Sequence, residues 1–266
     1  LYETMKDESF AVIEENGIIN KAWRLNDTKK LARITEYFND KKILIADGHH
    51  RYETALKYCK ENRSKVDDSA HVMMFLTNLD AQSLAVYPIH RLIKSPAPFD
   101  EADFMNQVEN YFSVGPISEG IEKNKIRKAL DSADAGDIVF YVYFGQGRGC
   151  FIKIKEKTNM LPLLAADESE ELMVLDVAQL HTIILKNILN IDTKEPNSQK
   201  YVTYKVDMIE ALGRVDSGEF DLAFFMNATR VNDVRNLAEK GIRLPQKATF
   251  FYPKLLSGLV INKFES

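Results

Sequence analysis

The turn Asp47-Gly48-His49-His50-Arg51 carries the densest group of chemically capable side chains in this sequence. The guanidinium of Arg51 is a planar fork of donors that matches phosphate or carboxylate. Each neighbouring imidazole can donate a hydrogen bond, accept a proton or bind a metal. We therefore expect an anion site here, with phosphate as the best single ligand. A turn of this composition can also be purely structural, with histidines that only cap the following helix.

The flanking sequence places this turn between a strand and a helix. Ile43–Ala46 is a short apolar run between lysines and the Asp-Gly pair, which predicts a strand. Residues 51–60 repeat apolar side chains at the spacing of one helix face, namely Tyr52, Ala55, Leu56 and Cys59. The turn is then a helix N-terminus, where unpaired backbone N–H groups and the positive end of the helix dipole attract anions.

Several strings of this sequence resemble one family of bacterial and archaeal proteins, the domain of unknown function 1015 family. ADGHHRYETAL (residues 46–56) is similar to its N-terminal signature, and PQKATFFYPKLLSGLV (residues 245–260) is similar to its C-terminal one. Segments resembling further family motifs lie between them in the expected order: YPIHRL (87–92), DVAQLH (176–181) and EFDLAFF (219–225). The likeness therefore spans most of the chain.

The turn also resembles the strand-turn-helix box of the ParB and sulfiredoxin superfamily, in which a Gly-x-x-Arg type turn cradles nucleotide phosphates. The resemblance implies a mixed α/β (α+β) fold, with a ParB/sulfiredoxin-like strand-turn-helix region and a C-terminal α/β region. It further implies that Gly48 lets the backbone approach the phosphates closely and that His49, His50 and Arg51 contact them. Asp47 would orient a base or help to hold Mg²⁺, so the implied catalytic residues are Asp47, His50 and Arg51.

Free-serine kinases of that superfamily suggest the function. By this analogy the protein is a nucleotide-binding phosphotransferase that uses ATP or ADP with Mg²⁺ and acts on a small metabolite, with serine as the leading candidate. One alternative is a noncatalytic nucleotide or anion sensor, which would bind with the same turn but show no turnover. Another is a metal-dependent hydrolase with His49, His50, His90 and Asp47 as ligands, although the sequence has no His-x-x-x-His or Glu-x-x-His spacing.

Three further segments contribute candidate phosphate-site residues. His90 and Arg91 follow Pro88, which predicts an edge or bulged strand; they can converge on the same anion or simply face solvent. The basic, aromatic loop 245–254 offers Lys247, Thr249, Tyr252 and Lys254, unless its aromatics are core and its lysines solvated. His181 lies within the apolar stripe of a helix predicted over Asp176–Leu189, where a buried histidine is commonly structural.

The chain alternates predicted strands and helices, with a soft boundary at the prolines near residue 96. We expect a region over residues 1–95 that contains the turn and a mixed α/β region over residues 96–266 that packs on it. Predicted strands cover residues 71–79, 84–93, 138–144, 150–155, 201–206 and 220–226, and predicted helices cover residues 101–112, 121–133 and 231–240. Asp207 and Glu210 form a capping box that predicts a further helix, which Gly218 can end. The glycine-rich stretch Gly145–Gly149 precedes an alternating run rather than a helix, which indicates a hairpin turn and not a phosphate loop.

Composition narrows the function classes. The 266 residues are 45% hydrophobic and 28% charged, which is typical of a globular protein, and a net charge of −4 argues against broad nucleic-acid binding. No apolar stretch approaches the roughly 20 residues that span a bilayer, and no signal-peptide pattern is present, so we expect a cytoplasmic protein without a membrane partner. Cys59 and Cys150 are too few for a disulfide framework or a zinc site.

The chain begins at Leu1 without an initiator methionine, and compared with the family pattern we expect it to be a fragment. In the related kinases, acidic residues before the phosphate turn help to activate the acceptor. Five carboxylates near the start of the chain precede the turn, and none of them fits a motif: Glu3, Asp7, Glu8, Glu14 and Glu15. The general base can therefore lie outside this sequence.

Overall fold

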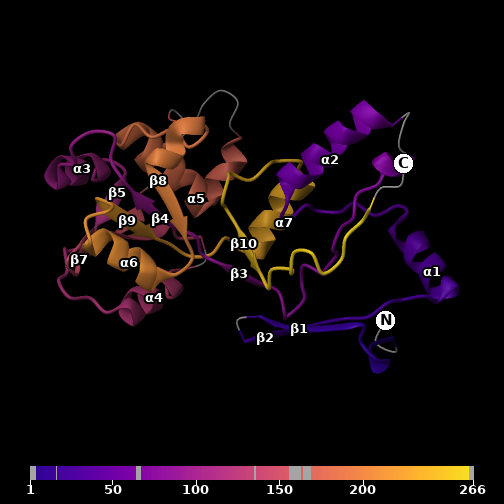
Figure 1. Ribbon diagram of the computed structural model, residues 1–266. Coiled ribbons are helices and arrows are strands. Elements are labelled where there is room, and N and C mark those ends of the chain that lie inside the picture. Colours follow the sequence, from indigo (N-terminus) through magenta and orange to yellow (C-terminus); the bar gives the residue numbers. More distant parts are fainter. Residues whose placement is uncertain are drawn as a thin grey trace. The chain divides into compact units, whose positions relative to one another are not determined.

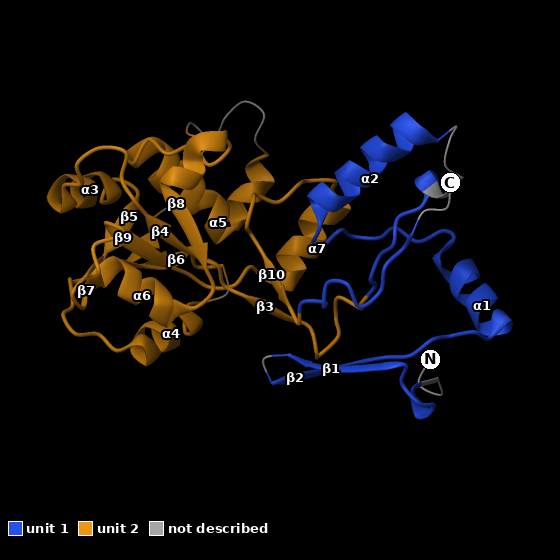
Figure 2. Cartoon of the chain, viewed as in Figure 1, with its two compact units in different colours: residues 1–76, 254–266 blue, residues 77–253 orange. Residues whose placement is uncertain are grey.

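The computed structural model describes residues 4–15, 17–63, 67–134, 136–155, 163 and 169–263 (Figure 1). The chain divides into two compact units (Figure 2), unit 1 with residues 1–76 and 254–266 and unit 2 with residues 77–253. The sequence placed one boundary near residue 96, whereas the chain passes between units after residues 76 and 253. Helices and antiparallel sheets occur together, which confirms the predicted mixed α/β class. Among the described helices, none is long and apolar enough to cross a membrane.

Unit 1 contains an antiparallel hairpin and two α-helices. Its elements are η1 (Thr4–Lys6), β1 (Ala11–Glu15), β2 (Ile18–Ala22), α1 (Thr28–Phe38), α2 (His49–Asn62) and η2 (Asp67–Ala70). The carboxylate of Asp27 begins α1 by accepting hydrogen bonds from the backbone N–H groups of Lys29 and Lys30. Helix α2 confirms the helix predicted after the Asp-Gly turn.

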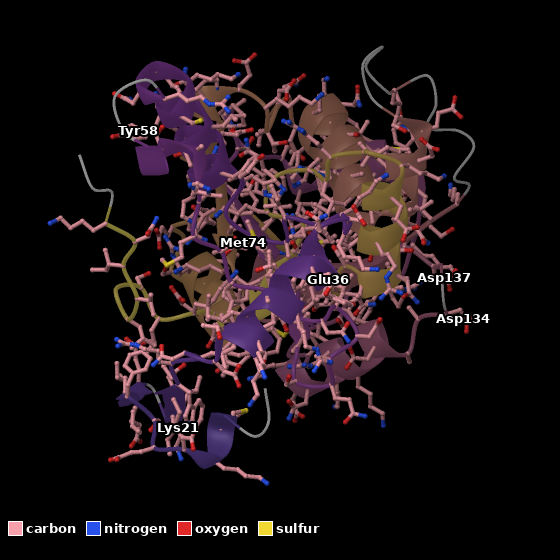
Figure 3. All side chains as sticks on the ribbon, turned by 90° about the vertical axis from the view of Figure 1, so that its right-hand side faces the viewer. Lys21, Glu36, Tyr58, Met74, Asp134 and Asp137 are labelled. Atoms are coloured by element: carbon pink, nitrogen blue, oxygen red, sulfur yellow. The ribbon has the colours of Figure 1, made fainter. Side chains whose placement is uncertain are left out.

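Two strands predicted in unit 1 are wrong. Residues 43–46 and 71–76 are not hydrogen-bonded to any neighbouring strand within the described part of the chain. Their side chains are largely exposed: Phe75 is 62% exposed and Met74, labelled in Figure 3, is 54% exposed. An apolar run shows only that a segment suits a pleated surface, and a strand also requires a partner that completes its hydrogen bonds.

Unit 2 is built on a six-stranded antiparallel sheet with strand order β5-β7-β6-β9-β4-β8. Its strands are β4 (His90–Ile93), β5 (Phe112–Val114), β6 (Val139–Gly145), β7 (Arg148–Ile154), β8 (Val202–Lys205) and β9 (Leu222–Phe225). A separate two-stranded sheet pairs β3 (Ala85–Tyr87) with β10 (Phe250–Tyr252). The helices are α3 (Glu101–Val108), α4 (Lys123–Asp131), η4 (Glu170–Val174), α5 (Asp176–Gln179), η5 (Leu180–Ile188), η6 (Pro196–Lys200), α6 (Met208–Asp216) and α7 (Val231–Glu239).

The two faces of the large sheet bury separate hydrophobic clusters, because alternate strand residues point in opposite directions. On the α4/α6 face, Leu92 of β4 and Phe225 of β9 pack with helices α4 and α6. On the α3/α5 face, Ile93 and Phe224 pack with α3, α5 and η5. Figure 1 shows these helices around the sheet. Successive residues of β4 and β9 therefore alternate between the two hydrophobic clusters.

Several local predictions for unit 2 are confirmed. The glycine-rich stretch is the turn of the β6–β7 hairpin, with Gln146 and Gly147 at positive φ of 53° and 74°. Asp207 caps α6 by accepting from the backbone N–H groups of Ile209 and Glu210 at 2.7 and 3.1 Å. The helix predicted from Asp176 forms, but Leu175 is its N-cap residue and its second part, η5, is a π-helix.

Pro88 has a different effect from the one predicted. It lies between β3 and β4, so it removes no hydrogen bond from either strand. β4 is an internal strand, paired with β8 on one side and β9 on the other, and the predicted edge position is wrong. The proline separates two sheets instead of weakening one.

Candidate anion-binding site

The start of α2 has unpaired backbone donors next to a glycine in the left-handed region. Gly48 is the N-cap residue in the left-handed region, with φ 88° and ψ 28°, and no side chain of the described structure caps the helix there. The first intrahelical bond runs from the N–H of Tyr52 to the carbonyl of Gly48. The N–H groups of the three residues before Tyr52 thus lie ahead of the helical ladder, as an anion site requires.

Arg51 folds back over this glycine. A Cβ atom built on Gly48 would lie 2.9 Å from both Nε and Nη2 of Arg51, so any larger residue would displace the guanidinium. The side chain of Arg51 is 78% exposed, and its Nη2 lies 3.4 Å from Asp47 Oδ2. The positive φ favours glycine at this position, and a side chain there would have to push the Arg51 guanidinium aside.

The C-terminal segment of the chain brings a second cation to the same carboxylate. Lys254 Nζ donates to Asp47 Oδ2 at 3.2 Å, although the two residues are 207 positions apart. Both belong to unit 1. Asp47 therefore lies between the cations of Arg51 and Lys254, and the structure joins the DGHHR turn to the end of the PQKATFFYPK segment.

The two histidines of the turn are accessible. His49 and His50 are exposed, and His50 Nδ1 lies 3.5 Å from Glu53 Oε2 within the first helical turns. The described residues contain no group of three or more histidine, cysteine or carboxylate side chains placed to hold a metal ion. Both imidazoles can contact a ligand at the helix start, and among the described residues only Asp47 offers a carboxylate within the turn itself.

His90 and Arg91, in unit 2, do not lie on one side of their strand. The ring of His90 packs against Phe225 on the α4/α6 face, with ring centroids 4.8 Å apart. The guanidinium of Arg91 contacts Met226 on the α3/α5 face. A single small anion therefore cannot contact both side chains from one face of the sheet. Burial, followed by the charges of Arg91 and Arg127, lowers the pKa of His90 to about 4.

Arg91 is almost fully buried, with 1% exposure. Its Nη2 donates to the backbone carbonyl of Lys247 at 2.9 Å, and Nη1 contacts the Met226 sulfur and the Ile89 carbonyl. The guanidinium carbon also lies 5.5 Å from the centre of the Tyr204 ring. Burial lowers the pKa of Arg91 to about 10. None of these partners is a carboxylate.

The remaining candidates in unit 2 occupy different settings. His181, on η5, is buried, and its Nδ1 lies 3.1 Å from the Thr193 hydroxyl. Lys247 has an exposed side chain and a positive φ of 55°, Thr249 is half-buried, and Tyr252 packs its ring 5.2 Å from that of Tyr87. Burial, and then the charge of Arg91, lowers the pKa of His181 well below its usual range.

Two features of the site were missed by sequence reasoning. The bond from Lys254 to Asp47 joins segments at opposite ends of the chain, and only the basic character of the tail hinted at it. The contacts of Arg91 with Met226 and Tyr204 carry no sequence signal, since neither residue belongs to a polar motif. Among the acidic residues just before the helix that begins at Asp176, Glu168 falls outside the described residues, and Glu171 pairs with Lys240 at 3.0 Å.

Comparison with known families identifies the chain. The family model described as "Protein of unknown function (DUF1015)" matches residues 2–178, more than half of the sequence. The chain belongs to the DUF1015 family. This match includes the DGHHR turn, His90 and Arg91 but ends before His181 and the C-terminal loop. No curated protein matches this DUF1015 chain.

A solved structure with some similarity is a conserved hypothetical protein from Pyrococcus furiosus. It shares 16% sequence identity with this DUF1015 protein, and the alignment covers 84% of this chain and 82% of that one. The TM-score is 0.39, too low to establish a common fold.

Proposed function

We propose that this DUF1015 protein binds the phosphates of ATP or ADP at the start of α2 and is a phosphotransferase for a small hydroxylated metabolite, with serine as the favoured acceptor. The proposal includes distant kinship with the ParB/sulfiredoxin superfamily and a cytoplasmic location. The observation that carries it is the pair of cations, Arg51 and Lys254, that contact the Asp47 carboxylate beside the start of α2, where the first backbone N–H groups precede the helical ladder.

This arrangement suits phosphoryl transfer, which depends mainly on positioning and on positive charge around the transferred group. The backbone of Gly48 and the two cations would bind phosphate oxygens, since Arg51 and Lys254 are both at least partly exposed. Asp47 has the oxygen ligands that Mg²⁺ prefers, and the metal would offset the charge of the phosphates. His50 can accept the proton of an acceptor hydroxyl.

The other predicted phosphate-site residues remain proposals of lower rank. His90, Arg91, His181, Lys247, Thr249 and Tyr252 all belong to unit 2, and the first three are buried. The phosphate site is therefore proposed for Gly48, His49, His50, Arg51 and Lys254, with Asp47 beside them.

One observation favours the alternative of a noncatalytic nucleotide or anion sensor. Asp47 Oδ2 already accepts hydrogen bonds from Arg51 and Lys254, so it would have to release a cation before it could accept a proton from an acceptor hydroxyl. A sensor would use the same cations for binding and would need no base.

A turnover assay separates these functions. The chain is incubated with Mg²⁺, serine and either ATP or ADP, and phosphoserine is measured for the wild type, Arg51→Ala, Lys254→Ala and the control Arg33→Ala, which removes an exposed cation from α1. A kinase forms phosphoserine in the wild type and the control and loses it in the other two variants. Nucleotide binding without product indicates a sensor, and failure of the wild type to bind nucleotide contradicts both proposals.

A further inference from the structure

The buried guanidinium of Arg91 has no compensating negative charge among the described residues. All its hydrogen-bond acceptors are neutral, two backbone carbonyls and one sulfur, and its Nε atom has no hydrogen-bond partner. A buried charge is normally paired with an opposite one, because removing it from water has a large unfavourable free energy. The environment of Arg91 therefore contains no described negative charge, and the N–H of Nε is available to donate to a bound anion.

His181 provides a second buried nitrogen without a partner. When the Thr193 hydroxyl donates to Nδ1, the neutral imidazole carries its proton on Nε2, and that atom is buried with no acceptor. The residue lies on the same face of the sheet as Arg91: Leu180 and Ile184, on either side of it, belong to the same cluster as Met226, which touches the guanidinium. Burial, and then the positive charge of Arg91, lowers the pKa of His181.

The local backbone at both ends of this pair is unusual. His181 is the second residue of the π-helix η5, a rare form that is often found at functional sites. On the other side, Lys247 has a left-handed backbone, and its carbonyl accepts the hydrogen bond from Arg91 Nη2. Its side chain is exposed, so the 245–249 loop connects the buried guanidinium to the surface.

We propose that Arg91 and His181 form a second binding site, in unit 2, for the carboxylate of a small organic acid. One carboxylate oxygen would accept from Nε and the other from Nη2, in place of the Lys247 carbonyl, and the His181 Nε2–H would donate to one of them. A carboxylate fits better than a phosphate dianion, because the neutral histidine leaves a single positive charge in the site. The site is independent of nucleotide binding at α2.

The test uses acetate as the probe and the complete chain. Thermal unfolding and the arginine Nε–H resonances of ¹⁵N-labelled protein are followed during an acetate titration at constant ionic strength, with chloride and inorganic phosphate titrations alongside. The variants are Arg91→Met, which keeps an apolar stem of similar shape but removes the guanidinium and its charge, and His181→Phe. Arg148→Met is the matched control, because Arg148 already has a carboxylate partner, Glu101, at 2.8 Å.

We expect acetate to raise the unfolding temperature of the wild type and the control and to shift one arginine Nε–H resonance. Arg91→Met should abolish that stabilisation, and His181→Phe should weaken acetate binding about tenfold through loss of one donor to a charged group. An equal response to chloride, a response that Arg91→Met retains, or no resonance shift in the wild type would overturn the proposal. A response to phosphate alone would overturn the carboxylate assignment. Should Arg91→Met fail to fold, the wild-type resonance shift and His181→Phe still decide the question.

Discussion

At the scale of single residues, the chain buries basic side chains without a carboxylate partner among the described residues. His90 has 2% exposure, its Nδ1 atom has no hydrogen-bond partner, and its ring packs on Phe225. The sequence showed that His90 and Arg91 are adjacent on a strand. It could not show that β4 is internal, which is the reason that both faces of the strand, and hence both side chains, are buried.

The buried imidazole of His90 predicts a loss of stability in acid. The folded pKa of about 4 lies below the unfolded value of 6.5, so the unfolded state binds more protons between these values. The stabilisation is fully present above pH 6.5 and is lost as the pH falls toward 4, by at most about 3 kcal/mol. Urea unfolding followed by circular dichroism should show that the free energy of unfolding falls less between pH 6.5 and 4 for His90→Phe than for the wild type. The exposed control His71→Asn should leave the loss unchanged, and an equal loss in His90→Phe would contradict this assignment.

A second residue-scale prediction concerns Gly48. Gly48→Ala places a Cβ atom 2.9 Å from the Arg51 guanidinium and strains a backbone with φ 88°, so it should displace Arg51 and weaken binding of Mg-ADP about tenfold. Gly258→Ala is the matched control, since Gly258 has φ 86° but no atom within 4 Å of a built Cβ. Both variants incur similar backbone strain. Calorimetric binding that falls equally in the two would show that Arg51 has no part in the effect.

At the scale of elements, helices were easier to predict than strands. The α2, α4, α6 and α7 helices follow from apolar spacing along their own sequence, which is local information. The strands predicted at 43–46 and 71–79 failed because a strand depends on a hydrogen-bonded partner elsewhere in the chain. In the candidate site, the helix start could be predicted, whereas the contact of Lys254 with Asp47 could not, because it is set by tertiary structure alone.

The N-cap of α6, which the sequence predicts, can be tested by substituting Asp207. Asp207→Ala removes the acceptor for the N–H groups of Ile209 and Glu210 and should lower the free energy of unfolding by about 1 kcal/mol. Asp207→Asn keeps an oxygen acceptor and should retain most of that stability. Urea unfolding of the two variants measures the difference, and an Asn variant as unstable as the Ala variant would show that the loss comes from charge and not from capping.

At the scale of the whole molecule, the two units differ in how many hydrophobic side chains they bury. Every buried hydrophobic residue of the described chain lies in unit 2, and Ser69 is the one buried residue of the described part of unit 1. Apolar burial is the main source of cooperative stability, so the two units should differ in local stability.

Hydrogen exchange can measure that difference. Backbone amides of β6 and β9, which lie inside the large sheet, should exchange slowest, and those of α2 should exchange far faster. Mg-ADP should slow exchange at the start of α2 if it binds there. Equal protection of α2 and β9 without ligand would contradict the assignment of the stable core to unit 2.

The central claim is that the turn at the start of α2 binds nucleotide phosphates. Isothermal titration of the wild type, Arg51→Ala and Arg33→Ala with Mg-ADP tests it most directly, because both variants remove one exposed arginine from a helix of unit 1. We expect binding by the wild type and by Arg33→Ala, with affinity about 10- to 100-fold weaker in Arg51→Ala. Absence of binding by the wild type, or equal affinity in all three, would contradict it.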